Sequence, residues 1–570
     1  MEGEKRVKPW LRFYDEGVPA SLDYPSIPLD RFLSDAAARY PEQPAIFFGA
    51  RVGRHILDRA INYRQLNEAV NRFAAGLQGL GLQKGDRVAI VLPNCPQYVI
   101  AFYSILRAGG IAVPCNFLYT AQELEYQLND AGAEIVIVLS RFYQKIDAIR
   151  ARTQLQHIIV TNIKEYFPRS LRLLFTLAKE KKEGHHVALS SMDDRWLQAL
   201  LAGSPPRPDS VEVDPEDTAC LLYTGGTTGI PKGAQLLHRN LVANAVAGLV
   251  WSHARPAREI TLGALPLFHS YGMTSVMNMA VAGALAMILI PDPRDVLHIM
   301  GSISKHKATF YPGVPTMYVA INNHPRVGDF DLSSIVCCLS GAAPLPGKVQ
   351  EKFQTLTNCK LVEAYGLTET SPATHVNPVY GQNKIGSIGL PWPDTDARIV
   401  DLDTGEQEMP VGEIGELVIQ GPQVMKGYWR RPVETAQVLR EHPALGSGLW
   451  LHTGDVARMD EEGYFQIVDR KKDMIICGGF NVYPREVEEI LFKHPAVQEA
   501  AVVGVPDEYR GETVKTFISL KEGTTCTEQE IIAFCREHLA PYKVPTLVEF
   551  WPELPKSAVG KVLRRELATR

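Results

Sequence analysis

The sequence of 570 residues has little of three things: paired cysteines, excess charge of one sign, and long apolar runs. Its nine cysteines are an odd number and, apart from Cys337 and Cys338, they stand singly. This spacing predicts neither a disulfide framework nor a CxxC metal site, and it fits reduced thiols in the cytoplasm. The formal net charge of −5 lacks the basic excess typical of nucleic-acid-binding proteins, so no nucleic-acid partner is expected.

One segment, MTSVMNMAVAGALAMILI at 273–290, has about the length of a membrane span. Asn278, Gly283 and the lack of basic flanks favour a buried helix that ends near Gly283, followed by a buried strand before the sequence PDP. The first residues also lack the apolar stretch that a secretory signal needs. A soluble protein is therefore expected.

The composition that is present is typical of a soluble enzyme, with 45% hydrophobic and 22% charged residues. Such a long chain exceeds what one hydrophobic core supports, so we expect two or more domains. From residue 84 onward, apolar runs such as DRVAIVL, GIAVPC and EIVIV alternate with helical patterns such as CPQYVIAFYSILRAG and TAQELEYQLNDAG. This alternation predicts βαβ units around largely parallel sheets, and hence an α/β fold.

Two segments interrupt this alternation. Residues 167–203 begin with the basic, amphipathic FPRSLRLLFTLAKEKKEGHH, which predicts a surface insertion with a solvated charged face or, alternatively, a weak contact with a membrane surface. The sequence DRKKD at 469–473 precedes about a hundred residues of further strand and helix patterns, enough for a small α/β domain. We therefore predict a large domain over 1–470 and a small C-terminal domain over 471–570.

The first motif that carries chemistry is YTGGTTGIPKG at 223–233, directly behind the apolar ACLL. Glycines allow consecutive backbone N–H groups to point into one concavity, and threonine hydroxyls and Lys232 add donors for phosphate oxygens. A Walker P-loop needs glycine before its lysine and Ser or Thr after it, whereas here Pro231 precedes the lysine and Gly233 follows it. The motif therefore predicts a phosphate-binding loop of another kind.

Further short motifs follow at intervals. LPLFHSYGM surrounds one histidine with apolar residues, and SGAAPL is a small-residue turn where backbone approaches a flat ligand closely. EAYGLTET offers an aromatic platform, a hydroxyl and a carboxylate in Tyr365, Thr368 and Glu369. LWLHTGD ends in Asp455, an acceptor suited to ribose hydroxyls, and PKSAVGKVLRREL places Lys561 in a glycine-containing turn.

In this order the motifs resemble those of the adenylate-forming superfamily: acyl- and aryl-CoA synthetases, luciferases and the adenylation modules of nonribosomal peptide synthesis. The resemblance runs from Leu29 to Leu567, and the stretch GLWLHTGDVARMDEEGYFQIVDRKKDMIICGGFNVYPREVEE is most similar to bacterial long-chain fatty acid–CoA ligases. It implies ATP-dependent activation of a medium- to long-chain fatty acid through an acyl-adenylate to acyl-CoA, with Mg²⁺ and coenzyme A. It also implies a large domain with a β-barrel-like part and a small mobile domain.

The resemblance assigns roles in the first half-reaction. Thr224 and Glu369 would lie near Mg²⁺, and Tyr365 would stack on adenine. Lys561 would bridge the attacking carboxylate and the α-phosphate, which Thr368 also approaches. The implied catalytic residues are Lys561, Thr368, Glu369 and His269. The implied nucleotide and coenzyme A residues are Thr224, Gly225, Gly226, Thr227, Thr228, Gly229, Lys232, Gly341, Ala342, Ala343, Glu363, Ala364, Tyr365, Gly366, Thr368, Asp455, Ile467, Arg470, Lys472, Gly478, Gly479 and Lys561.

A second geometry is also implied, reached by rotation of the small domain at Lys472, in which Gly478 and Gly479 border the tunnel for the pantetheine arm. Asp455 and Arg470 would hold the ribose. The implied acyl pocket is lined by His269, Tyr271, Met273, Gly313 and Val314. The implied partners are the fatty acid, ATP and coenzyme A, with a weak peripheral membrane contact and a homodimer as further hypotheses. The implied location is the cytoplasm, including the inner face of the membrane.

Two positions depart from the family pattern. Relatives usually have Ser or Thr where Gly225 stands, and some long-chain members place a Trp near Met273 as a gate on the fatty-acid tunnel. Three alternatives stay open. An aryl- or short-chain acid–CoA ligase would share every nucleotide motif. An amino-acid-activating module needs an Asp beside the Phe of LPLFH, where this chain has His269. A non-catalytic acyl-binding member would not need the charged motif residues that are present.

Overall fold

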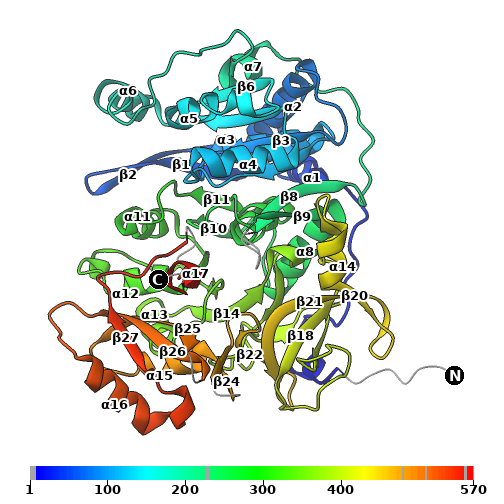
Figure 1. Ribbon diagram of the computed structural model, residues 1–570. Helices are drawn as coiled ribbons and strands as arrows, with labels where there is room; N and C mark the ends of the chain where they lie inside the picture. The colour runs from blue at the N-terminus through cyan, green and yellow to red at the C-terminus, as the bar shows by residue number, and fades with distance from the viewer. Residues whose placement is uncertain (1–7, 225–229, 478–479, 508–509, 558–561, 569–570) are drawn as a thin grey trace. The chain divides into compact units, whose positions relative to one another are not determined.

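The protein has a mixed α/β structure, and the computed structural model describes residues 8–224, 230–477, 480–507, 510–557 and 562–568 (Figure 1). The α/β class expected from the sequence is confirmed. The chain divides into two compact units. The smaller unit comprises residues 1–10, 396–420 and 438–570, and the larger comprises residues 11–395 and 421–437. The domain boundary expected at residue 470 stays a prediction.

In the larger unit, eight described strands form a sheet whose central strands are parallel. The central strands β3 and β5 read as continuous apolar runs because both faces of the sheet are covered. In spatial order the strands are β19 (Gly427–Tyr428), β9 (Lys232–Leu237), β8 (Thr218–Thr224), β4 (Ile111–Pro114), β3 (Arg87–Val91), β5 (Ile135–Leu139), β6 (His157–Thr161) and β7 (Arg195–Trp196).

Nine described strands form a second sheet in the same unit, with a parallel centre from β14 to β1. Successive parallel strands end at one edge of this sheet, where the small residues Gly341, Ala342 and Ala343 follow β13. In spatial order the strands are β16 (Leu390–Pro391), β15 (Ala373–Val376), β14 (Lys360–Gly366), β13 (Cys337–Ser340), β12 (Phe310–Gly313), β10 (Ile260–Gly263), β11 (Ala286–Leu289), β1 (Pro44–Val52) and β2 (His55–Asn62).

Helices connect the strands where the sequence patterns predict them. α3 (Pro96–Arg107) starts with a proline and is buried along almost its whole length. α4 (Ala121–Ala131) begins at Thr120, whose hydroxyl accepts the N–H of Glu123, and ends at Gly132. The other α-helices that contribute to this unit are α1 (Arg31–Arg39), α2 (Tyr63–Gly79), α5 (Tyr143–Asp147), α6 (Arg169–Ala178), α7 (Leu197–Gly203), α8 (His238–Trp251), α9 (Ser270–Gly272), α10 (Met279–Ala282), α11 (Val296–His306), α12 (Pro315–Asn322), α13 (Gly347–Thr357) and α14 (Pro432–Val438).

The apolar segment at 273–290 is a buried helix followed by a buried strand, as expected. A π-helix, η5 (Met273–Asn278), continues into α10, which ends at Gly283, and β11 follows. Among the helices that the structure describes, none is long and apolar enough to cross a membrane.

The described strands of the smaller unit form two sheets. The first is antiparallel throughout and comprises β17 (Asp396–Val400), β18 (Gly415–Gln420), β21 (Gly446–Met459), β20 (Leu439–His442) and β22 (Phe465–Arg470). The second comprises β24 (Phe480–Val482), β23 (Ile475–Cys477), β26 (Gly511–Leu520), β25 (Val497–Asp507) and β27 (Leu547–Phe550), and it packs against α15 (Pro484–Leu491), α16 (Glu528–His538) and α17 (Arg564–Ala568).

Candidate functional site

The glycine-rich motif connects the antiparallel strands β8 and β9. Thr224 and Lys232 are paired across these strands, so their side chains project to the same face at the base of the connection. The Thr224 hydroxyl and the Lys232 ammonium group, both predicted to bind phosphate, therefore project from paired positions at the base of the loop. The other predicted members of the loop, Gly225, Gly226, Thr227, Thr228 and Gly229, lie outside the described residues.

A half-buried tyrosine, Tyr223, supports this base. The ring of Tyr223 lies against Gly233, where an added Cβ would stand 3.2 Å from the ring. Its hydroxyl donates to Oδ2 of Asp130 at 2.8 Å, and Arg431 binds the other oxygen of that carboxylate at 2.7 Å. Burial and the Asp130 carboxylate raise the pKa of Tyr223, so the phenol stays a donor. A side chain at position 233 would therefore crowd this ring.

The predicted metal ligand Glu369 lies in the 3₁₀-helix η7 (Thr368–Thr370), which packs against β9. Its Oε1 accepts a hydrogen bond of 2.8 Å from the hydroxyl of Tyr428. The Nζ of Lys232 lies 5.5 Å from the centroid of the same tyrosine ring, within cation–π distance. Burial, together with Glu369, raises the pKa of Tyr428, so the tyrosine donates to the carboxylate at neutral pH. Tyr428 thus interacts with both Lys232, through its ring, and Glu369, through its hydroxyl.

The predicted adenine-binding segments meet at the ends of β12, β13 and β14. Ser340 pairs with Gly313 on one side and with Glu363 on the other, and the N–H of Gly341 donates to the carbonyl of Gly313 at 3.3 Å. Parallel strands of an open sheet offer a ligand site at this edge. Tyr365 is half-buried there and packs edge-on against His375, with ring centroids 5.9 Å apart. The structure therefore places residues 341–343 beside residues 363–366, the two segments predicted to bind adenine.

The predicted acyl-pocket residues adjoin this edge. The hydroxyl of Tyr271 donates to the carbonyl of Leu339 at 2.6 Å, and an added Cβ on Gly341 would stand 3.2 Å from the Tyr271 ring. The N–H of Tyr271 donates to Nδ1 of His269 at 3.2 Å. The remaining predicted lining residues, Met273, Gly313 and Val314, are buried. Tyr271, predicted for the acyl pocket, thus lies beside Gly341, predicted for adenine binding.

In the smaller unit, the predicted ribose-binding residues form an ion pair. Asp455 on β21 and Arg470 on β22 are cross-strand partners, and Arg470 Nε lies 3.2 Å from Asp455 Oδ1. The Asp455 side chain is buried, whereas Arg470 is partly exposed. Ile467 lies on β22, and Lys472 is exposed in the turn that follows this strand. The ion pair with Arg470 therefore fixes the orientation of the Asp455 carboxylate.

Glu416 on β18 holds this pair of strands together. Its carboxylate accepts the N–H of Gly454 at 3.1 Å and the Nζ of Lys471 at 3.2 Å. His452 Nδ1 lies 3.4 Å from the same carboxylate. Burial opposes ionisation of Glu416, but His452 and Lys471 outweigh it and lower its pKa to about 2. The buried carboxylate of Glu416 thus binds Gly454, which precedes Asp455, and Lys471, which follows Arg470.

Arg564 on α17 gathers three carboxylates. It lies 2.6 Å from Glu488, 3.3 Å from Asp473 and 3.4 Å from Asp469. Burial raises the pKa of Glu488 and of Asp469, and the charge of Arg564 opposes that rise. This cluster ties α17 to the segment that carries Arg470. Three predicted residues of the smaller unit, Gly478, Gly479 and Lys561, lie outside the described residues.

Comparison with known proteins assigns the family. The family model described as AMP-binding enzyme matches residues 33–429, and the model described as AMP-binding enzyme C-terminal domain matches residues 486–561. The chain belongs to the AMP-binding enzyme family. The superfamily resemblance of its motifs is thereby confirmed.

Individual relatives of this AMP-binding enzyme match along nearly the whole chain. This chain is 48% identical in sequence to the long-chain-fatty-acid–CoA ligase of Bacillus subtilis, over 98% of this chain and 97% of that protein. It is 42% identical to the long-chain-fatty-acid–CoA ligase of Escherichia coli O6:H1, over 98% of each. ATP-bound MatB from Rhodopseudomonas palustris has a similar structure, with a TM-score of 0.80 and 30% identity over 95% of this chain and 99% of that one.

The AMP-binding enzyme has oxygen donors suited to Mg²⁺ near the base of the predicted phosphate-binding loop. Within the described ranges, no three His, Cys, Asp or Glu side chains are grouped so that they could hold a metal ion by themselves. Mg²⁺ commonly takes one or two protein oxygens and completes its shell with water and substrate phosphates. Glu369, oriented by Tyr428, offers such an oxygen, and the hydroxyl of Thr224 offers another. The donor set fits Mg²⁺ bound together with ATP.

Three supporting residues of the AMP-binding enzyme were missed from the sequence. Tyr428, Glu416 and Arg564 contact partners that lie 59, 55 and 95 residues away, at Glu369, Lys471 and Asp469 respectively. No local pattern specifies such contacts. The one available signal was the place of Arg564, three residues after Lys561.

Proposed function

We propose that this AMP-binding enzyme activates a medium- or long-chain fatty acid with ATP and transfers it to coenzyme A. The acid and ATP form an acyl-adenylate and pyrophosphate, and the thiol of coenzyme A then displaces AMP to give the thioester. The observation that carries the proposal is the 48% identity to a long-chain-fatty-acid–CoA ligase along 98% of the chain. The placement of Thr224, Lys232 and Glu369 around one loop base supports it.

The first half-reaction joins two anions, so cations and N–H donors must be preorganised where charge develops. The attacking carboxylate is already ionised and needs no general base. Lys561 neutralises charge between the carboxylate and the α-phosphate, and Thr368 donates to the α-phosphate. Lys232 and the phosphate loop hold the departing pyrophosphate. When bound, Mg²⁺ adds positive charge beside the phosphate oxygens, at Glu369 and Thr224.

The nucleoside is assigned to two sets of residues. Tyr365 stacks on adenine, with the small residues 341–343 leaving room for the flat base. Asp455 accepts hydrogen bonds from the ribose hydroxyls, and its ion pair with Arg470 fixes the orientation of the carboxylate. In the second half-reaction, Lys472 is the hinge, and Gly478 and Gly479 leave space for the pantetheine arm.

The acyl chain is assigned to the side of the sheet edge that carries Tyr271. The proximity of Tyr271 to Gly341 supports this assignment, because the carboxylate of the acid must reach the α-phosphate of the nucleotide. Apolar pocket walls discriminate by only about 1–3 kcal/mol per methylene. We therefore expect a graded preference among chain lengths rather than a sharp limit.

A cytoplasmic location is part of the proposal. The described cysteines are all free thiols, which fits a reducing compartment. A homodimer stays a hypothesis.

The experiment is a product assay with ATP, Mg²⁺ and coenzyme A over acids from acetate to long-chain fatty acids, with benzoate and cinnamate as aryl acids. The expected result is acyl-CoA, AMP and pyrophosphate in equal amounts, with the highest kcat/KM for a medium- or long-chain acid. Absence of all three products with every acid would contradict the ligase proposal. A higher kcat/KM for an aryl acid than for every fatty acid would contradict the substrate class.

A further inference from the structure

Helix α6, within the predicted insertion, is apolar on two of its sides. Leu171 and Phe175 form the buried side. Leu173, Leu174 and Leu177 form a second apolar side, at relative positions i, i+1 and i+4, and are exposed to 61%, 49% and 78%. The solvated charged face expected for this insertion is therefore accompanied by an exposed face of leucines, which we call the leucine face.

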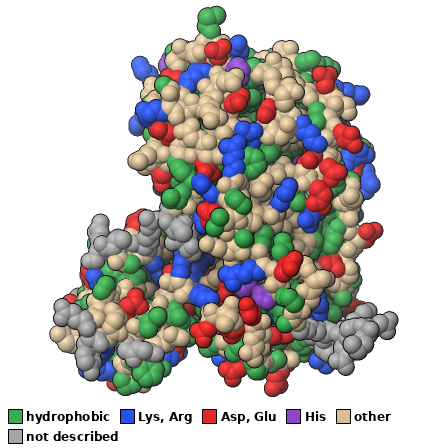
Figure 2. Space-filling view, turned by 45° about the vertical axis from the view of Figure 1, so that its right-hand side comes forward, with side chains coloured by type: hydrophobic (Ala, Val, Ile, Leu, Met, Phe, Trp, Pro, Cys, Tyr) green, Lys and Arg blue, Asp and Glu red, His purple; other side chains and the backbone are tan. Residues whose placement is uncertain are grey.

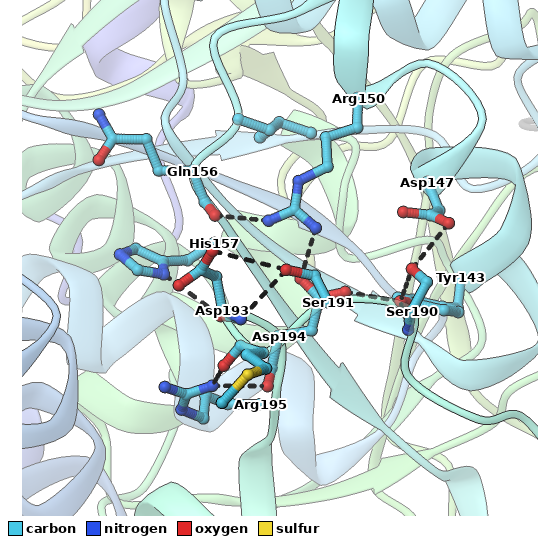
Figure 3. Close-up of polar contacts among 12 residues, drawn as sticks. Tyr143, Asp147, Arg150, Gln156, His157, Ser190, Ser191, Asp193, Asp194 and Arg195 are labelled. Atoms are coloured by element: carbon cyan, nitrogen blue, oxygen red, sulfur yellow. Dashed lines mark hydrogen bonds and ion pairs between the residues drawn. The ribbon is translucent and has the colours of Figure 1, made fainter.

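The fold holds α6 firmly at both ends of the insertion. Lys164, before the helix, forms an ion pair of 2.5 Å and little exposure with Glu180, just after the helix. After it, the wholly buried carboxylate of Asp194 accepts hydrogen bonds from Tyr143 at 2.6 Å and from Arg150 at 2.9 Å (Figure 3). Figure 1 shows α6 at the outer edge of the larger unit. The leucine face is thus presented outward from an anchored base.

Cationic side chains are frequent in α6 and in the residues on either side of it. Residues 164–183 contain six Lys or Arg and three Glu, in a chain whose net charge is −5. Two of the glutamates are held by Arg172 and Lys179, at 2.7 Å and 3.3 Å. The exposed cations of α6 and of the segment that follows it are Arg169, Arg172, Lys179, Lys181 and Lys182. Apolar and cationic groups therefore share one exposed surface.

We propose that the leucine face docks the enzyme on a membrane surface that contains anionic lipids. An interfacial helix buries apolar side chains at the acyl boundary while Lys and Arg stay among the headgroups, and α6 with its flanks has this arrangement. A second copy of the chain fits less well, because pairing two leucine faces would bring like charges together. On the face drawn in Figure 2, by contrast, hydrophobic side chains are scattered among polar and charged ones, as on ordinary soluble surfaces.

The test uses the purified full-length protein and vesicle sedimentation. Vesicles of phosphatidylcholine with phosphatidylglycerol should bind the protein, and vesicles of phosphatidylcholine alone should bind it more weakly. Raising the salt from about 0.1 M to about 0.5 M should reduce the binding. Leu173→Gln/Leu177→Gln should weaken binding by more than about tenfold. Leu547→Gln, which removes a leucine that is 47% exposed on β27, should bind as wild type does.

A second double variant removes two lysines and keeps all three leucines of the leucine face. Lys181→Gln/Lys182→Gln should weaken binding to anionic vesicles by roughly 25-fold, since each cation near such a surface contributes about 1 kcal/mol. Thermal unfolding midpoints equal to that of wild type would show that the variants are folded. The proposal is overturned if wild type does not bind anionic vesicles, or if both double variants bind as wild type does. It is also overturned if, without lipid, sedimentation velocity shows a dimer that Leu173→Gln/Leu177→Gln dissociates. None of these readouts depends on the proposed reaction.

Discussion

The hydroxyl of Tyr428 donates a hydrogen bond of 2.8 Å to Oε1 of Glu369. The same ring lies 5.5 Å from Nζ of Lys232. One side chain therefore positions both the carboxylate proposed for Mg²⁺ and the lysine proposed for pyrophosphate. Since hydrogen-bond partners of metal ligands strongly affect metal affinity, this contact should matter for the first half-reaction.

Tyr428→Phe keeps the ring under Lys232 and removes only the hydrogen bond to Glu369. We expect the Mg²⁺ concentration for half-maximal ATP–pyrophosphate exchange to rise about tenfold, because the carboxylate loses its orientation. Tyr40→Phe, at a partly exposed tyrosine just after α1, is the control and should leave the Mg²⁺ dependence unchanged. An unchanged Mg²⁺ dependence in Tyr428→Phe would show that the contact is only structural.

Glu416→Gln should raise the KM for ATP by about tenfold, because hydrogen bonds and ion pairs of a charged group contribute about 1.5–3 kcal/mol. The substitution keeps the shape of the side chain but weakens its hold on Gly454 and Lys471, next to Asp455 and Arg470. Initial rates over a range of ATP concentrations measure the effect. A lower kcat with an unchanged KM for ATP would argue against a positioning role toward the ribose residues.

Glu416 should also make stability depend on pH in the acid range. Its pKa is lowered from 4.5 to about 2, so its stabilising effect is complete above pH ~4.5 and is lost as the pH falls toward ~2. The full effect is about 3 kcal/mol by linkage. Urea unfolding of wild type and Glu416→Gln at several pH values should show a difference that shrinks as the pH falls from about 5 to about 2. A difference that stays constant over this range would contradict the assignment.

Arg564→Met should lower the stability of the smaller unit by about 3–5 kcal/mol, since it leaves Glu488 and Asp469 as buried carboxylates without their cation. Thermal unfolding checks this effect. Arg326→Met, at a surface arginine paired with Asp329, is the matched control and should change little. Equal midpoints for the two variants would mean that the buried cluster does not stabilise the unit.

Lys561→Ala should reduce acyl-adenylate formation by about 10²–10³-fold, as expected for loss of a charge-stabilising donor in the transition state. Conversion of supplied acyl-AMP and coenzyme A to the thioester should be retained, because that step does not neutralise the α-phosphate in the same way. Single-turnover assays of the two half-reactions separate the effects, with Lys493→Ala at an exposed lysine after α15 as control. Equal loss of both half-reactions would exclude the assigned role.

The sequence by itself was sufficient where the physics is local. The Thr120 cap and the terminal Gly132 define α4 through contacts within a few residues, and the apolar run at 273–290 reads as a helix and a strand from its length and its break at Gly283. The order of the motifs was likewise enough to indicate the family, because each motif is a short segment with its own chemistry.

Only the tertiary structure decided which distant groups meet. Net charge and spacing do not tell Glu416 from any other acidic residue, and its role appears only because β18, β21 and β22 pair side by side. The helical pattern of α6 likewise contains two sets of apolar residues, and only packing decides that Leu171 and Phe175 are buried while Leu173 and Leu177 are exposed. Periodicity is a property of a single segment, whereas burial depends on what the rest of the chain packs against it.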